Sequence, residues 1–145
     1  MSNAFAELEA DAAEWYRNNM YKLIADGGNF VDDVVKLYAP PFTYLDLEGE
    51  IPLTGQQETT EFIQSFSDWL DESPGWRAEL AGIQTQALND TGMVLVAEWR
   101  IVDSEGKSVS DGETIQYFYM LSRRDGTWQV VGEGTVSAKT RVELK

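Results

Sequence analysis

The second half of the chain contains four long strand-like segments separated by short turns, and this pattern leaves few folds open to the sequence. The segments are residues 76–88, 93–103, 112–123 and 127–138, and the turns between them, around residues 89–92, 104–107 and 124–126, each contain a glycine. Long strands joined by short turns of this kind pair as an antiparallel meander. The sequence therefore predicts a sheet of at least four antiparallel strands.

Helical patterns occupy much of the first half. Apolar residues at three- and four-residue spacing predict a helix over residues 5–24, which Gly27 and Gly28 end. A second, short helix is predicted after Asn29, with Pro40 and Pro41 as its stop. Its apolar stripe consists of Val31, Val34, Val35 and Tyr38.

A strand pair and a third helix follow. Residues 42–47 are predicted to form a strand, with a short return strand over residues 51–53. Thr54 and Gln57 have the spacing of a capping box, which marks the start of a helix. The apolar face of this helix consists of Phe62, Ile63, Phe66, Trp69 and Leu70.

Helices segregated from an antiparallel sheet make an α+β domain, and the length of 145 residues suits one domain, residues 1–145. A sheet of long strands is strongly twisted, so helices laid against its concave side close most of a cone. Small-molecule sites tend to occur in such enclosed places. We therefore expect a pocket between the sheet and the helices.

The composition excludes several kinds of chemistry. The chain has no cysteine and no histidine, which rules out disulfides, thiolate nucleophiles and every catalytic arrangement built on histidine. Acid–base chemistry must then use carboxylates, tyrosine, lysine or a bound cofactor. No phosphate-binding glycine motif or calcium-loop spacing is present, so no cofactor and no metal are expected.

The formal charge of -14 makes nucleic acid and anionic membranes poor partners. High acidity usually serves solubility, and the alternative is an acidic face for a basic protein partner. The apolar runs are far shorter than the roughly 20 residues of a membrane-spanning helix, and the N-terminus has no pattern of a secretory signal. The expected location is therefore the cytoplasm.

A local pattern then points to a family. It consists of residues 28–30 at the start of the second helix, residues 37–42 (Leu-Tyr-Ala-Pro-Pro-Phe), Asp46 with Gly49, Gly55, and the third helix with Phe62 and Phe66. With the order of the elements, this pattern resembles the nuclear transport factor 2-like superfamily, and within it the SnoaL-like group, over residues 5–138. The resemblance implies the cystatin-like cone of three helices on a strongly curved, mostly antiparallel sheet.

The resemblance also implies candidate catalytic residues. The ketosteroid isomerases of this superfamily carry a tyrosine late in the first helix and an aspartate at the end of the first strand, and the matching positions are Tyr21 and Asp46. Tyr21 would donate to a developing oxyanion and Asp46 would act as base. Those enzymes use another acid on a later strand, and at the matching place this chain has aromatic residues and no acid. The structural alternatives are a packed helix tyrosine and a turn-forming aspartate.

Aromatic residues are expected to line the pocket; they are Tyr16, Phe42, Tyr44, Phe62, Phe66, Trp99, Tyr117 and Tyr119. Ordinary core and cross-strand packing is the alternative interpretation of the sheet aromatics. Glu98 and Arg100 share one face of their strand and loosely resemble part of the site of limonene epoxide hydrolases, or else form a surface ion pair. Residues 93–103 and 112–123 have apolar residues on both faces, which predicts a homodimer through the sheet.

Two classes of function remain open at this point. The first is a SnoaL-like pocket protein that acts on a small apolar carbonyl compound as a cofactor-independent isomerase, cyclase or dehydratase. The second is a non-catalytic ligand-binding or protein-interaction module of the same fold, since fold alone does not fix function. An enzyme requires at least two polar groups that converge on an otherwise apolar cavity.

Overall fold

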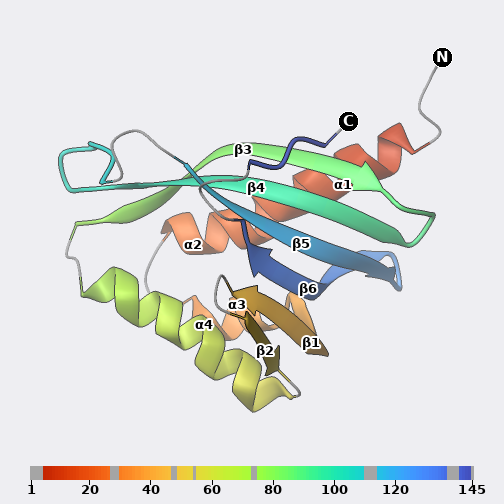
Figure 1. Cartoon of the computed structure of the whole chain (residues 1–145), viewed down its shortest axis with the longest axis horizontal. Helices are drawn as coiled ribbons and strands as arrows, with labels where there is room; N and C mark the ends of the chain where they lie inside the picture. The colour runs from red at the N-terminus through yellow and green to blue at the C-terminus, as the bar shows by residue number, and fades with distance from the viewer. Residues whose placement is uncertain are drawn as a thin grey trace.

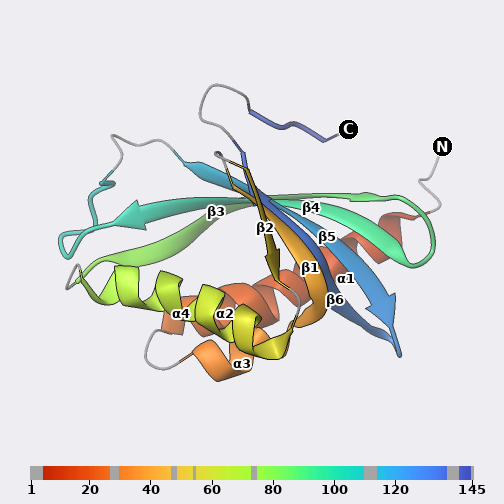
Figure 2. The ribbon, with the colours of Figure 1, turned by 60° about the horizontal axis from the view of Figure 1, so that its bottom comes forward.

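The structure is a computed structural model that describes residues 5–26, 30–46, 49–53, 55–72, 75–109, 114–136 and 141–144. For a few residues in these ranges only the backbone is described. The fold is α+β, with helices on one side of a curved six-stranded sheet (Figures 1 and 2). No helix in the described ranges is long and apolar enough to cross a membrane.

The sheet has the strand order β2-β1-β6-β5-β4-β3. Its strands are β1 (Tyr38–Asp46), β2 (Gly49–Leu53), β3 (Arg77–Ala87), β4 (Gly92–Val102), β5 (Ile115–Arg124) and β6 (Thr127–Thr135). The predicted meander is confirmed, because β3 to β6 pair antiparallel in sequence order. Asp125 and Gly126 both have positive φ, as a two-residue hairpin turn between β5 and β6 requires. β1 joins the far side of β6 in parallel, so the sheet is mixed.

The first predicted helix is present but not uniform. It consists of α1 (Ala6–Tyr16), a π-helical turn η1 (Arg17–Tyr21) and α2 (Lys22–Asp26). In the π turn the N–H of Lys22 bonds to the carbonyl of Arg17, five residues back. The other helices are α3 (Val31–Val35) and α4 (Gln56–Asp71), and α3 buries the three valines of its predicted stripe. The predicted caps at Asn29 and Thr54 lie outside the described residues.

The first strand begins earlier than its predicted start at residue 42. Tyr38, which the sequence places on a helix, is the first residue of β1, and the two prolines lie inside the strand. Its pairing with β6 jumps from Tyr38 to Thr43, and its pairing with β2 begins only at Phe42. Pro40 and Pro41 therefore fall in an irregular part of the strand, where no ladder hydrogen bond is needed from them.

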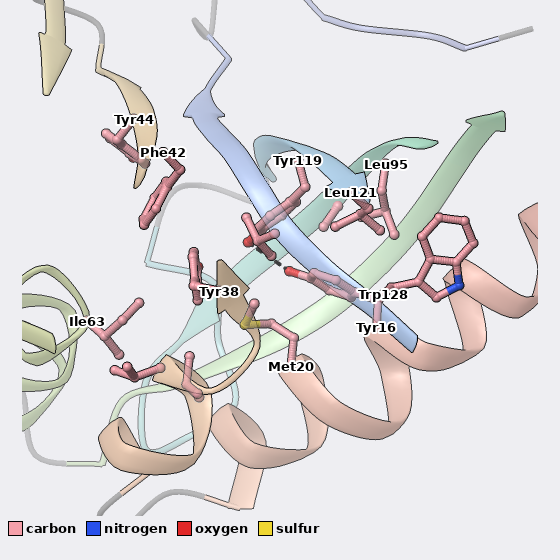
Figure 3. Packing of buried hydrophobic residues seen from close by; sticks show 14 of the residues in the cluster. Tyr16, Met20, Tyr38, Phe42, Tyr44, Ile63, Leu95, Tyr119, Leu121 and Trp128 are labelled. Carbon is pink, nitrogen blue, oxygen red and sulfur yellow. Dashed lines mark hydrogen bonds between the residues drawn. The ribbon is translucent and has the colours of Figure 1, made fainter. Parts of the chain in front are cut away.

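The core lies between the concave face of the sheet and the helices (Figure 3). The alternate residues of β4 that the sequence assigns to one apolar face are all buried: Met93, Leu95, Ala97, Trp99 and Ile101. Tyr16 and Met20 fill the space beneath them from the first helical segment, each at most 1% exposed. Each such large side chain contributes about 1.5–3 kcal/mol by leaving water, so this layer holds the helices to the sheet.

Candidate functional site

A cavity of about 390 Å³ lies within the core between the helices and the sheet. Met20 and Ile24 line it from the first helical segment, Val34 from α3 and Ile63 from α4. Its wall is mostly apolar, and the polar side chains that the described residues contribute to it include tyrosines, Ser65 and one carboxyl group. This volume lies within the range of ordinary small-molecule sites.

The carboxyl group belongs to Glu133 on β6, which is only 6% exposed. Burial removes the water that would stabilise a carboxylate, and it raises the pKa of Glu133 from its ordinary value of 4.5 to about 7. The Tyr38 hydroxyl donates a hydrogen bond to Oε1 of Glu133, and this bond lowers the pKa in part. Glu133 can therefore exchange a proton near neutral pH.

Strand pairing surrounds Glu133 with tyrosines. Tyr44 on β1 is its partner on one side and Tyr119 on β5 is its partner on the other. Side chains directly opposite each other on adjacent strands lie about 5 Å apart at Cβ, so these rings flank the carboxyl group.

Glu133 was missed by the sequence analysis, which found no acid on a late strand to match the isomerases. The reason lies in the strand geometry. Trp128 and Val130 face the core, so regular alternation would turn Glu133 to the outside. The register between β5 and β6 shifts at Val131, because Leu121 pairs with Val130 and Met120 pairs with Gly132. This irregularity reverses the alternation and turns Glu133 inward.

The hydroxyl of Tyr119, a second polar group in the cavity wall, is the last member of a chain of hydrogen bonds. The indole N–H of Trp99 donates to the Tyr16 hydroxyl at 3.0 Å, and Tyr16 donates to the Tyr119 hydroxyl at 3.0 Å (Figure 3 draws the second bond). Burial raises the pKa of both tyrosines, so their hydroxyls stay protonated. Among the described residues, none accepts the proton of Tyr119, which lines the cavity.

Most of the predicted pocket residues lie in the cavity wall; they are Tyr44, Phe62, Phe66, Trp99, Tyr117 and Tyr119. Tyr16 and Phe42 are buried beside the wall, where Tyr16 contacts Tyr119 and Phe42 contacts Phe62. Burial also raises the pKa of Tyr117 to about 12. Trp69 lines the cavity as well, although it is 43% exposed, and its ring stacks on Phe66.

The two predicted catalytic residues are placed differently. Tyr21 is half-buried and does not line the cavity, and its ring packs on Trp99 with centroids 5.6 Å apart. The tyrosine of the first helical segment that joins the polar network is instead Tyr16. Asp46 is the last residue of β1, but its side chain lies outside the described part of the structure.

Glu98 and Arg100 do not form the predicted pair. Glu98 lies on the outer face of β4 and forms an ion pair with Arg141 at 3.2 Å. It also accepts hydrogen bonds from Gln116 and Thr114. Within the described ranges no group of three or more acidic side chains is placed to hold a metal ion.

Comparison with known proteins supports the fold. No family model matches the chain, and no curated protein matches it by sequence. Among solved structures, it is similar to a nuclear transport factor 2-like protein of unknown function from Pseudomonas putida KT2440, with a TM-score of 0.67, 15% identity, and coverage of 89% of this chain and 85% of that chain.

Two further structures agree. A domain of unknown function with a cystatin-like fold from Nostoc punctiforme PCC 73102 has a TM-score of 0.63, 15% identity, and coverage of 95% of this chain and 82% of that chain. Aln2 from a Streptomyces species has a TM-score of 0.64, 14% identity, and coverage of 90% of both chains. This chain therefore has the nuclear transport factor 2-like, cystatin-like fold, and likeness at such identities carries no specific function.

Proposed function

We propose that this protein binds a small, largely apolar carbonyl compound in its cavity and moves a proton on that compound through Glu133. The reaction class is that of a cofactor-independent isomerase, cyclase or dehydratase. The observation that carries the proposal is the buried carboxyl group of Glu133, with a pKa of about 7, which is the one carboxyl group that the described residues bring to this mostly apolar cavity. A general base is most effective when its pKa lies near the working pH.

The neighbouring tyrosines supply the second part of such a site. A carbonyl oxygen gains negative charge when a proton leaves the adjacent carbon, and a neutral hydroxyl in a dry cavity stabilises that charge. Tyr119 lies directly across the strand pair from Glu133, and its pKa is raised, so it remains a donor. Glu133 would take the proton while Tyr119 holds the oxygen.

The shape of the wall favours a flat apolar ligand. Phe62, Phe66 and Trp69 present their rings from α4, and Trp99 and Tyr117 face them from the sheet. Flat rings pack against one another by offset or edge-to-face contact, which contributes about 0.5–1.5 kcal/mol for each pair. An aromatic or polycyclic carbonyl compound fits this surface.

The proposal can be tested without knowledge of the natural substrate. The probe is 2-tetralone, a small bicyclic ketone, and the measurement is exchange of its α-hydrogens for deuterium in D2O, followed by NMR. Glu133→Gln keeps the shape of the side chain and removes the base, so exchange should fall by about 10²-fold or more. Glu79→Gln, which removes a carboxylate on the outer surface of β3, should leave the rate unchanged.

Asp46→Asn distinguishes the two candidate bases. If this variant loses exchange and Glu133→Gln retains it, Glu133 is not the base and the prediction from the sequence is preferred. Binding of the probe without exchange in the wild-type protein would instead favour the non-catalytic ligand-binding alternative.

A further inference from the structure

The outer face of the sheet holds a segment of extended chain. Residues 141–144 lie on the side of the sheet opposite the helices, beside β3, β4 and β5 (Figure 2). Gln116 on β5 points to this outer side and is only 2% exposed. Val96 on β4 is fully buried although it faces away from the helices and lies outside the main core cluster. Val96 is the cross-strand partner of Gln84, one of the two residues whose side chains bind this segment.

Two glutamine side chains bind the backbone of this segment. Gln116 accepts a hydrogen bond from the N–H of Val142 at 2.8 Å and donates one to its carbonyl at 3.0 Å. Gln84 on β3 donates to the same carbonyl at 3.1 Å and accepts from the N–H of Leu144 at 2.6 Å. A side-chain amide offers one acceptor and two donors. Each glutamine therefore pairs with an N–H and a carbonyl of the segment, as the backbone of a neighbouring strand would.

The side chain of Arg141 also binds the outer face of the sheet. Its guanidinium forms the ion pair with Glu98 and donates to the carbonyl of Thr114 at 2.9 Å and to the Thr114 hydroxyl at 2.8 Å. Gln116 and Thr114 in turn donate to the carboxylate of Glu98, which fixes that group toward the segment. Two nitrogen atoms of the planar guanidinium thus reach three acceptors, an arrangement that the single ammonium group of lysine does not reproduce.

We propose that the outer face of β3, β4 and β5 is a recognition site for an extended peptide segment with arginine at the first of its four positions, and that residues 141–144 occupy it in cis. The contacts define what the site accepts: arginine at the first position, and residues other than proline at the second and fourth, since both must donate an N–H. A peptide of this chemistry from another chain would have to displace the C-terminal segment. This site is separate from the cavity and from the chemistry proposed for it.

The first test measures the contact within one molecule. Amide hydrogen exchange by NMR should show protected N–H groups at Val142 and Leu144 in the full-length protein, by about tenfold or more over exposed chain. Gln84→Leu should remove the protection at Leu144. Gln86→Leu is the matched control, because this residue lies two positions further along the same face of β3 and makes no hydrogen bond to residues 141–144 as described. Unprotected amides in the wild-type protein would overturn the proposal.

The second test measures binding between molecules. The full-length Val142→Pro variant lacks the N–H that bonds to Gln116, so its C-terminal segment should leave the site. A fluorescent peptide with the sequence of residues 137–145 should then bind this variant at least about tenfold more tightly than the wild-type protein, where the linked segment competes. The same peptide with alanine in place of arginine should bind more weakly. Equal affinity for both proteins, or no binding to the variant, would refute the inference.

Discussion

The hydroxyl of Tyr38 donates a hydrogen bond to the carboxyl group of Glu133, and the two residues come from the first and the last strand of the sheet in sequence order. The bond supports the ionised form of Glu133, whereas burial opposes it, and burial is the larger effect. The balance leaves a carboxyl group that is half-protonated at about pH 7.

The stability of the protein should depend on pH through Glu133. Below its ordinary pKa of 4.5 the group is protonated in both the folded and the unfolded chain, and between 4.5 and about 7 only the unfolded chain ionises. The folded state therefore loses stability as pH rises through this window, by about 3 kcal/mol in all. The Glu133→Gln variant has no ionisable group at this position, so its stability should not fall in this window for this reason. Urea titrations at pH 4.5 and pH 8 should show a stability difference between variant and wild type that grows with pH, and a constant difference would contradict the shift.

Removal of the Tyr38 hydroxyl should raise the pKa of Glu133 further. In Tyr38→Phe the carboxylate loses its donor while the group stays buried, so the charged form becomes less favourable. Carbon-13 NMR titration of the glutamate side chains should place the midpoint of Glu133 above its wild-type value. A midpoint that moves down, toward ordinary glutamate, would show that the bond does not support the ionised form.

The Tyr16 hydroxyl should matter to stability, and that of Tyr21 should not. Both rings come from the first helical segment and contact Trp99, but only Tyr16 accepts the indole N–H. Tyr16→Phe leaves that buried N–H without an acceptor, which costs about 1–3 kcal/mol. Tyr21→Phe is the matched control and should stay within about 0.5 kcal/mol of the wild type. Equal losses in thermal unfolding would mean that the chain of hydrogen bonds does not stabilise the fold.

Two glycines of β6 should differ in their tolerance of alanine. A Cβ atom at Gly134 would lie 2.3 Å from the ring of Phe118 and 3.0 Å from the carbonyl oxygen of Leu45. A Cβ atom at Gly132 would meet its nearest neighbour, on Met120, at an ordinary 3.5 Å. Gly134→Ala should therefore destabilise the protein by about 1–3 kcal/mol, and clearly more than Gly132→Ala. Chemical denaturation of the two variants checks the ranking.

The fold was largely predictable from local patterns. The turns after residues 88, 103 and 124 fixed the meander, and the alternation of β4 fixed which face is buried. The parallel pairing of β1 with β6 was not predictable in the same way, because it joins segments that share no turn. The start of β1 was predicted too late because two prolines normally end a helix, and here they fall in an irregular part of a strand.

The site was predictable only in part, for two physical reasons. The aromatic wall follows from residue type and strand alternation, whereas Glu133 faces inward only because an irregular register reverses that alternation. The π turn is a second local irregularity, and it affects how the tyrosines of the first helical segment are placed. It winds the helix wider, so that Tyr16 and Tyr21, five residues apart, both reach Trp99, and the deeper one makes the hydrogen bonds.

The parallel pairing of β1 with β6 has a consequence for the order in which the molecule is assembled. During synthesis the helices and the β1–β2 hairpin leave the ribosome well before β6, the strand that joins β1 to the rest of the sheet. Contacts between distant parts of a chain form slowly, and apolar surfaces remain exposed in the meantime. Tyr38 and Tyr44 therefore meet Glu133 only after β6 has been synthesised. The cavity closes only when nearly the whole chain has been made.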